Sequence, residues 1–164
     1  MTSYLRFDTP LGPMYAVANG DALAGLYFDG ARWSPGVDDR WTEDARHPAL
    51  AACAAQVAEY FTGKRHAFDL PCALEGTAFQ RRVWAAIARI PYGETITYTE
   101  LAAQAGAPGA ARAAGAATGR NPLTIVIPCH RVVGSHGDLT GYAGGMERKV
   151  DLLTREGVLQ ESLA

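Results

Sequence analysis

Short runs of alternating apolar and polar residues fill the first thirty positions of the chain. The runs SYLRFDT, GPMYAVA and ALAGLYFD are separated by the turn segments PLG and NGD. Alternation of this kind predicts β-strands, and an Asn-Gly pair between two such runs is a strong signal for a hairpin. Residues 31–46 are polar and show no clear period, which predicts a loop.

Helical spacing appears next. An Ala-rich run from Pro48 to Phe61 has the period of a helix, and Gly63 stops it. The segment HAFDLPCALEG then returns to extended chain and acts as a connector. Thr77 is a good N-cap for the following run AFQRRVWAAIARI, whose apolar residues fall on one stripe.

Two short helices and a last amphipathic helix are expected further along. The first short helix runs from Thr97 through Ala105, with Thr97 or Thr99 as a possible cap, and the second runs from about Ala110 to Thr118. The Gly-containing turn between them is typical of a helix-turn-helix. A buried extended segment is expected at 123–127, and the last helix at 146–156, closed by a glycine.

These elements predict an α+β fold with two parts. The first, residues 1–75, is a small N-terminal β-rich α/β lobe with one helix and a connector. The second, residues 76–164, is a mostly helical C-terminal domain. A chain of 164 residues with 48% apolar and 20% charged residues suits one compact unit or two small lobes sharing a core.

Charge is distributed unevenly. The net charge is −2, which argues against broad nonspecific attraction to nucleic acid. Residues 1–75 hold 6 basic and 10 acidic side chains, whereas residues 76–164 hold 9 and 7. The second part is therefore the better candidate to meet phosphate, with an affinity that is modest, local and sensitive to salt.

The cellular setting follows from simple absences in the sequence. No apolar run is long enough to suggest a membrane span. The first residues lack the basic patch and apolar stretch of a signal peptide. The three cysteines, Cys53, Cys72 and Cys129, are too few and odd in number for a disulfide framework. We therefore expect a cytoplasmic protein that does not bind membranes.

The second short helix has an unusual composition. Between Gly109 and Gly119 its only large side chain is Arg112. An ordinary packed Ala-rich helix is one interpretation. The other is that small residues let the helix approach a DNA backbone closely, so that Arg112 enters the base stack and fills the gap left by an extruded base.

One cysteine stands beside a base. Cys129 precedes His130 in the motif PCHR, and a thiol needs help to become a thiolate. With Glu156 to orient His130, the three residues fit the arrangement of nucleophile, base and orienting group. On chemistry alone, a cysteine hydrolase fits this arrangement as well.

The wider motif resembles a known family. Three motifs follow one another: NP at 121–122, IPCHRVVG at 127–134 and GYAGG at 141–145. They are preceded by a Phe and a Val-Trp pair in the helix after Thr77, and then by the short pieces IPYG, TY and ARA. This pattern is similar to that of the O6-alkylguanine-DNA alkyltransferases. The resemblance runs from near Thr77 to Gly157, about half the chain, and the N-terminal lobe fits the family only loosely.

The resemblance implies a reaction and its catalytic residues. Cys129 would attack the alkyl carbon on O6 of guanine, while His130, acting through a water with Glu156, would take the thiol proton. Tyr98 would hydrogen-bond N3 of the leaving guanine. The product is a thioether with no easy hydrolytic exit, so the protein would be consumed. Alternatives are a non-catalytic alkyltransferase-like DNA-lesion binder, which lacks the nucleophile, and a plain helix-turn-helix regulator.

The resemblance also implies binding residues, with Arg112 as the finger that replaces the extruded guanine. The expected DNA contacts are Thr97, Ala111, Arg112, Ala113 and Gly115. The expected substrate-pocket residues are Asn121, Val132, Tyr142, Ala143, Gly144 and Lys149. In this family the asparagine ties the helix-turn-helix to the active-site segment. A solvated position is the alternative for Lys149, and Arg131 is expected to be structural or to face a phosphate.

The sequence departs from the family at three positions. Ala143 stands where many members have Ser, Thr124 where some have Pro, and Asp151 where the last helix usually has an aromatic residue. Some members bind zinc, but the spacing of the histidines and cysteines in residues 1–75 matches no such site. We expect no metal and no cofactor, a monomer, and double-stranded DNA containing O6-alkylguanine as the partner.

Overall fold

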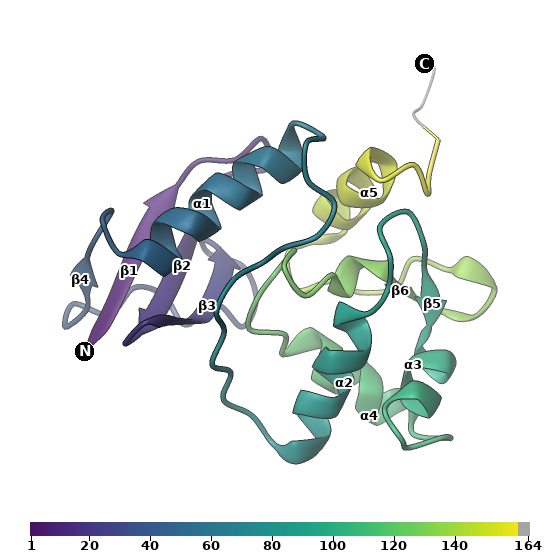
Figure 1. Ribbon diagram of the computed structural model, residues 1–164. Coiled ribbons are helices and arrows are strands. Elements are labelled where there is room, and N and C mark those ends of the chain that lie inside the picture. The colour runs from purple at the N-terminus through teal and green to yellow at the C-terminus, as the bar shows by residue number, and fades with distance from the viewer. Residues whose placement is uncertain (161–164) are drawn as a thin grey trace. The chain divides into compact units, whose positions relative to one another are not determined.

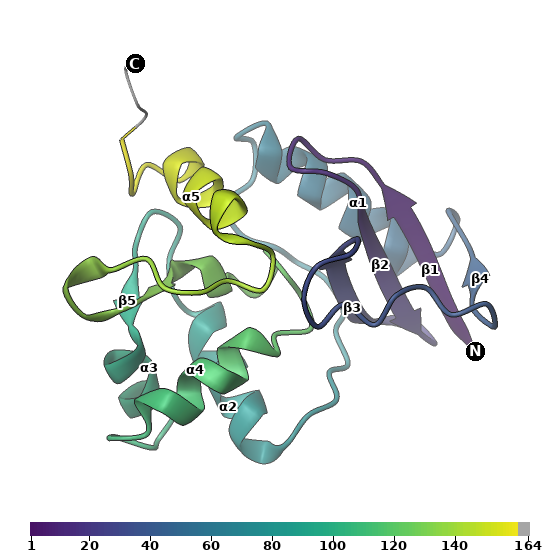
Figure 2. The same ribbon diagram turned by 180° about the vertical axis from the view of Figure 1, so that it is seen from behind.

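The computed structural model describes residues 1–160, which fall into two compact units (Figures 1 and 2). The first unit comprises Met1–Glu75 and Pro122–Thr124. The second comprises Gly76–Asn121 and the chain from Ile125 onward. The first holds a sheet and one helix, and the second is mostly helical, so the expected α+β fold class is confirmed.

The sheet of the first unit has the strand order β3-β2-β1-β4. Strands β1 (Thr2–Phe7), β2 (Met14–Asn19) and β3 (Ala22–Phe28) pair antiparallel, which confirms the three strands expected from alternation. Strand β4 (Thr42–Glu43) pairs parallel to β1. The interpretation of residues 31–46 as loop throughout is wrong here, because two residues are too few to show an alternation.

One helix covers the sheet. Helix α1 (Pro48–Phe61) packs against β1, β2 and β3 (Figure 1), and its bounds are those expected from the helical spacing. His47 caps it, since its side chain accepts hydrogen bonds from the backbone N–H groups of Ala49 and Leu50. Strand β2 is buried from Met14 through Ala18, so the Asn-Gly hairpin that ends it is anchored in the core of this unit.

Three helices form the centre of the second unit. They are α2 (Ala78–Ala88), α3 (Tyr98–Gln104) and α4 (Ala111–Gly119), which pack on one another. Capping boxes start the first two: the side chain of Thr77 accepts from the N–H of Gln80, and that of Thr97 accepts from the N–H of Glu100. The indole N–H of Trp84 donates to the carbonyl of Ala117 at 2.9 Å, which ties α2 to α4.

The remaining elements surround the cysteine. Strands β5 (Ile96–Thr97) and β6 (Val132–Val133) pair parallel. The 3₁₀ turns η1 (Cys129–Arg131) and η2 (Ser135–Gly137) flank β6, and α5 (Met146–Arg155) follows. Because β5 leads directly into α3, this small sheet holds the start of α3 beside the segment that contains Cys129.

One expected element is interrupted. The segment 123–127 does not run as a continuous extended strand, because Ile125 has a φ of 74° and lies in a turn. A β-branched residue rarely adopts that conformation, so no local pattern indicates it. Leu123 instead bridges Leu26 of β3, and its segment belongs to the first unit. Within residues 1–160, no helix is long and apolar enough to cross a membrane.

Candidate active site

Cys129 opens the turn η1 and is buried, with 6% of its surface exposed. Burial raises the pKa of its thiol, because the thiolate loses its hydration. A hydrogen bond from Asn121, the positive charge of Lys149 and a hydrogen bond from Tyr142 act in the opposite direction. Since burial is the largest effect, the thiol keeps its proton at neutral pH and needs a base to become a nucleophile.

His130 is placed to be that base. Its ring is fully buried, and its Nε2–H donates to Oε2 of Glu156 at 2.7 Å. This bond assigns the proton to Nε2 and leaves the lone pair on Nδ1, which is buried and has no hydrogen-bond partner in the described protein. Burial lowers the pKa of His130, although Glu156 opposes the shift. The ring is therefore neutral and able to accept a proton.

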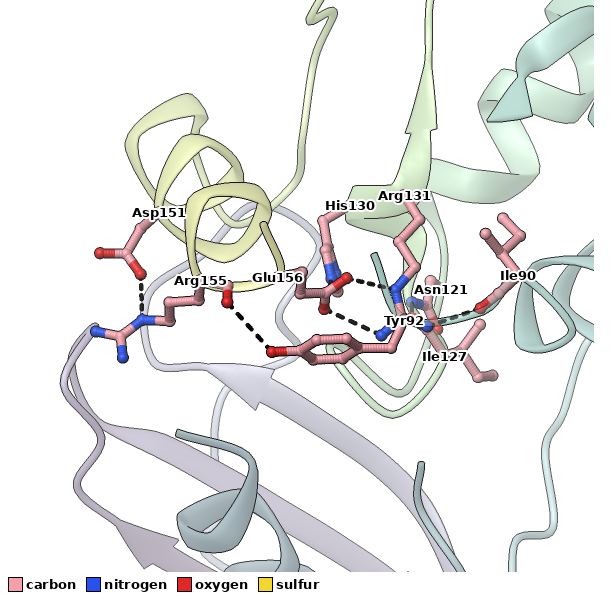
Figure 3. Close-up of polar contacts among 9 residues, drawn as sticks. All are labelled: Ile90, Tyr92, Asn121, Ile127, His130, Arg131, Asp151, Arg155 and Glu156. Atoms are coloured by element: carbon pink, nitrogen blue, oxygen red, sulfur yellow. Dashed lines mark hydrogen bonds and ion pairs between the residues drawn. The ribbon is translucent and has the colours of Figure 1, made fainter. Parts of the chain in front are cut away.

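Glu156 is the C-cap residue of α5 and binds two side chains of η1 (Figure 3). Besides His130, its carboxylate accepts from Nε of Arg131 at 2.7 Å and from Nη2 at 3.0 Å. The remaining terminal nitrogen, Nη1, donates to the carbonyl of Ile90 at 2.7 Å. Arg131 is 5% exposed, so the alternative in which it faces a phosphate is wrong and the structural alternative holds.

Lys149 is a second buried cation of the site. Its Nζ donates to the carbonyls of Val132 at 2.8 Å and Thr140 at 3.0 Å. The side chain has no exposed surface, so the solvated alternative is wrong. Burial lowers its pKa to about 8, which leaves the ammonium mostly charged at neutral pH. This charge lies close enough to Cys129 to favour the thiolate.

Asn121 connects the end of α4 to the cysteine segment. Its Nδ2 donates to the carbonyl of Ile127 at 2.7 Å (Figure 3), and its side chain also hydrogen-bonds Cys129. Among the other expected pocket residues, Val132 is fully buried, whereas three others are half-buried: Tyr142, Ala143 and Gly144. Tyr142 hydrogen-bonds the thiol of Cys129, so this segment borders the nucleophile.

Tyr98 is the first residue of α3 and is half-buried. Its ring lies 3.7 Å from the position that a Cβ would take on Gly115 of α4. Burial raises the pKa of its phenol, and a hydrogen bond with Thr140 partly opposes this. A thiolate at Cys129 would raise the pKa of Tyr98 further. The phenol is therefore protonated at neutral pH and can donate a hydrogen bond in the site of the thiol.

Helix α4 has two different faces. Ala114, Ala117 and Thr118 point into the second unit and are buried, as expected of a packed Ala-rich helix. Arg112 and Ala113 are exposed, while Ala111 and Gly115 are half-buried. The inner face therefore fits the interpretation as a packed Ala-rich helix, and the approach of the outer face to DNA stays a prediction. The hydroxyl of Thr97 serves as the N-cap of α3.

Two features of the site were not expected from the sequence. The bidentate pairing of Arg131 with Glu156 joins residues 25 positions apart. Tyr92 lies with its ring 5.6 Å from Cζ of Arg131 and donates its hydroxyl proton to the carbonyl of Arg155 at 3.2 Å (Figure 3). A buried arginine needs a counter-charge, but the sequence alone does not show that Arg131 is buried.

The departure at Asp151 leaves the end of α5 intact. Asp151 forms an ion pair with Arg155 one turn later on the same helix (Figure 3), and Glu156 follows in its hydrogen-bonded place. Within residues 1–160 there is no group of three or more His, Cys, Asp or Glu side chains that could hold a metal ion. The three cysteines are all free thiols.

Comparison with known proteins gives matches over nearly the whole chain. The family model described as 6-O-methylguanine DNA methyltransferase, ribonuclease-like domain, matches residues 2–74. The model of the DNA binding domain of the same family matches residues 78–158. A methylated-DNA–protein-cysteine methyltransferase of Mycolicibacterium paratuberculosis is 46% identical over 156 residues, which are 95% of this chain and 93% of the relative.

Solved structures are similar as well. A crystal structure of Mycobacterium tuberculosis OGT in complex with DNA aligns with a TM-score of 0.85 and 43% identity, covering 95% of this chain and 94% of the other. A structure of the Mycobacterium tuberculosis O6-methylguanine methyltransferase aligns with a TM-score of 0.83 and 44% identity, covering 95% and 93%.

Proposed function

The chain belongs to the 6-O-methylguanine DNA methyltransferase family, and from this premise we propose that Cys129 is the residue that accepts the alkyl group. The activity is DNA repair by direct reversal, in which the protein transfers an alkyl group from DNA to one of its own cysteines. The observation that supports Cys129 is its position in a buried site beside a neutral imidazole whose Nδ1 is free to take a proton.

The reaction proceeds in one displacement. The thiol proton of Cys129 passes through a water to Nδ1 of His130, and Glu156 stabilises the imidazolium that forms. The sulfur attacks the alkyl carbon, so that an S–C bond forms while the bond between that carbon and O6 breaks. The electron pair of the broken bond stays with guanine. Tyr98 donates a hydrogen bond to N3 and stabilises the developing charge.

The product limits each molecule to one reaction. A thioether has no ready hydrolytic route back to a thiol, so product stops at one equivalent per protein. No cofactor is required, because the bond that breaks is already present in the substrate. A cysteine hydrolase with the same three residues would turn over repeatedly, and a non-catalytic lesion binder would lack the nucleophile that Cys129 supplies.

The substrate is double-stranded DNA that contains O6-alkylguanine. Helices α3 and α4 serve as a helix-turn-helix, with the exposed small residues of α4 against the DNA backbone. Arg112 enters the stack in place of the extruded base, and the flipped base lies along the half-buried segment 142–144 and beside Tyr98. We propose that the protein acts as a monomer in the cytoplasm.

The test is the stoichiometry of repair. Duplex DNA with a labelled O6-methylguanine is incubated in excess with the protein in the presence of a chelator, and the intact protein is weighed by mass spectrometry. We expect a gain of one methyl group and a product plateau at one equivalent. Linear release of product far beyond one equivalent would support the hydrolase instead. An unchanged protein mass, with the lesion bound but intact, would support the non-catalytic binder.

A further inference from the structure

Arg131 and Tyr92 surround the carboxylate that orients His130. The contacts of Arg131 use Nε and both terminal nitrogens of the guanidinium: Nε and Nη2 donate to Glu156, and Nη1 donates to the carbonyl of Ile90. The ring of Tyr92 covers the guanidinium. An arginine fixed in this way holds both carboxylate oxygens in one orientation, which a single-point contact does not do.

The loop before β5 holds the end of α5 as well. The hydroxyl of Tyr92 donates to the carbonyl of Arg155, the last residue of α5. Gly93 has a φ of 83°, and a Cβ there would lie 3.3 Å from the carbonyl oxygen of Glu156. The backbone of this loop therefore lies directly against the residue whose carboxylate Arg131 binds.

We propose that Arg131 and Tyr92 are positioning residues for alkyl transfer: together they form a clamp that holds the Glu156 carboxylate against Nε2 of His130. The positive charge of Arg131 offsets the negative charge of Glu156, so that the His130 ring stays neutral before the reaction. The proposal rests on the proposed function of His130 as the base. Neither residue touches the substrate, and both act through Glu156. A carboxylate beside a histidine has two effects: it orients the ring, and it favours binding of a second proton by the ring. The clamp keeps the first effect and reduces the second.

The charges around His130 explain why a clamp is needed. The charged groups that act on it are Glu156 at the end of α5, Lys149 within α5 and Arg131 of η1, and the ring of Tyr92 lies against Arg131. Glu156 raises the pKa of His130, whereas Arg131 and Lys149 lower it. Without Arg131, the full charge of Glu156 would act on the ring. A ring that is already protonated cannot accept the thiol proton.

Arg131→Met tests the charge, and Arg155→Met is the matched control. Arg155 is also paired with a carboxylate of α5, but this pair is partly exposed, and Arg155 is not among the charges that shift the pKa of His130. We expect the titration midpoint of His130, followed by NMR on 15N-histidine protein, to move to higher pH in Arg131→Met. The acidic limb of the single-turnover rate should move with it, with a loss of about tenfold or more at mildly acidic pH. Arg155→Met should leave both profiles unchanged.

Arg131→Lys and Tyr92→Leu separate charge from geometry. Lysine keeps the charge but loses the two-point contact, so we expect a slower reaction at every pH with a histidine titration close to that of the parent. Tyr92→Leu removes no charge and should behave in the same way. It also tests the clamp if Arg131→Met does not fold.

Two results would overturn the proposal, and a third would instead refute the proposed function. A folded Arg131→Met protein whose His130 titrates as in the parent, with an unchanged pH profile, would contradict it. A Tyr92→Leu protein that reacts at the parental rate would show that the loop does not position Glu156. A parent protein that transfers no alkyl group would refute the proposed function instead, and the NMR titration would still decide whether Arg131 controls the proton affinity of His130.

Discussion

Two regions of the second unit differ in almost every physical respect. The active-site cluster, defined as Cys129, His130, Arg131, Lys149 and Glu156, is buried, charged and extensively hydrogen-bonded. The α4 surface, defined as Arg112 with the small residues Ala111, Ala113 and Gly115, is exposed or half-buried. The N-cap residue of its helix, Ala110, makes no side-chain capping hydrogen bond.

This difference separates two tasks. The cluster has to fix atoms relative to one another, so it depends on contacts between segments far apart in the sequence. In the proposed function the α4 surface lies against DNA, which requires small side chains there, with Arg112 as the exception. Substitutions in the cluster should therefore change chemistry and stability, whereas loss of the Arg112 side chain from the surface should change only the reaction with DNA.

The largest effect is expected from Cys129→Ser. Alkyl transfer should be lost completely, because a serine hydroxyl beside a neutral imidazole is a far weaker nucleophile toward an alkyl carbon. Binding to duplex DNA, measured by gel shift, should stay close to the parental affinity, since the proposed phosphate contacts come from α3 and α4 and not from the thiol. A collapse of DNA binding in a folded Cys129→Ser protein would show that the two regions are not separable.

The next largest effect is expected from Glu156→Gln. This change leaves Arg131 buried without a counter-charge, which should reduce the free energy of unfolding by about 3–5 kcal/mol. Asp151→Asn is the control, because its ion pair with Arg155 is partly exposed and should contribute less than about 1 kcal/mol. Urea denaturation of both variants measures the difference. Equal losses would mean that burial does not distinguish the two ion pairs.

Arg112→Ala should affect only the DNA reaction. Extruding a base costs a few kcal/mol, and a side chain that fills the gap offsets part of this, so the single-turnover rate at saturating duplex should fall about tenfold or more. The rate with free O6-benzylguanine should change little, because a free base needs no extrusion. Arg81→Ala, at an exposed arginine of α2, is the control for loss of one positive charge.

A contact with phosphate alone gives a different result for Arg112→Ala. In that case the variant would bind DNA more weakly, and saturating DNA would restore the parental rate. Full recovery at saturation would therefore contradict the role of Arg112 in the base stack.

The smallest effect is expected from Gly115→Ala. A glycine within a helix destabilises it relative to alanine, so the free energy of unfolding should rise by about 0.5–1 kcal/mol. The added Cβ would lie 3.7 Å from the ring of Tyr98, an ordinary contact. Thermal denaturation measures the gain. A loss of stability would mean that the ring of Tyr98 cannot accept even this contact.

Features with a local signal could be predicted from the sequence. The bounds of α1, the N-cap at Thr77 and the three long strands follow from periodicity and capping. Strand β4 and the turn at Ile125 could not be predicted, because the first is held by backbone pairing with β1 and the second requires a conformation unusual for its residue type.

The same division applies to the active site. Cys129, His130 and Glu156 were expected from the motif and the resemblance, and the structure brings all three together. The burial of Lys149 and the pairing of Arg131 were not settled by sequence, because each depends on which distant carbonyl or carboxylate the fold brings near. Tyr92 belongs to the IPYG piece of the resemblance, but the sequence assigned it no role, since one tyrosine in a loop is compatible with many roles.

The most direct test of the account is the position of the transferred alkyl group. The protein is reacted to completion with duplex DNA containing O6-methylguanine, digested, and mapped by tandem mass spectrometry. We expect one methyl group on the sulfur of Cys129, with Cys53 and Cys72 unmodified. A methyl group on Cys53 or Cys72 in protein whose Cys129 remains a free thiol would contradict it.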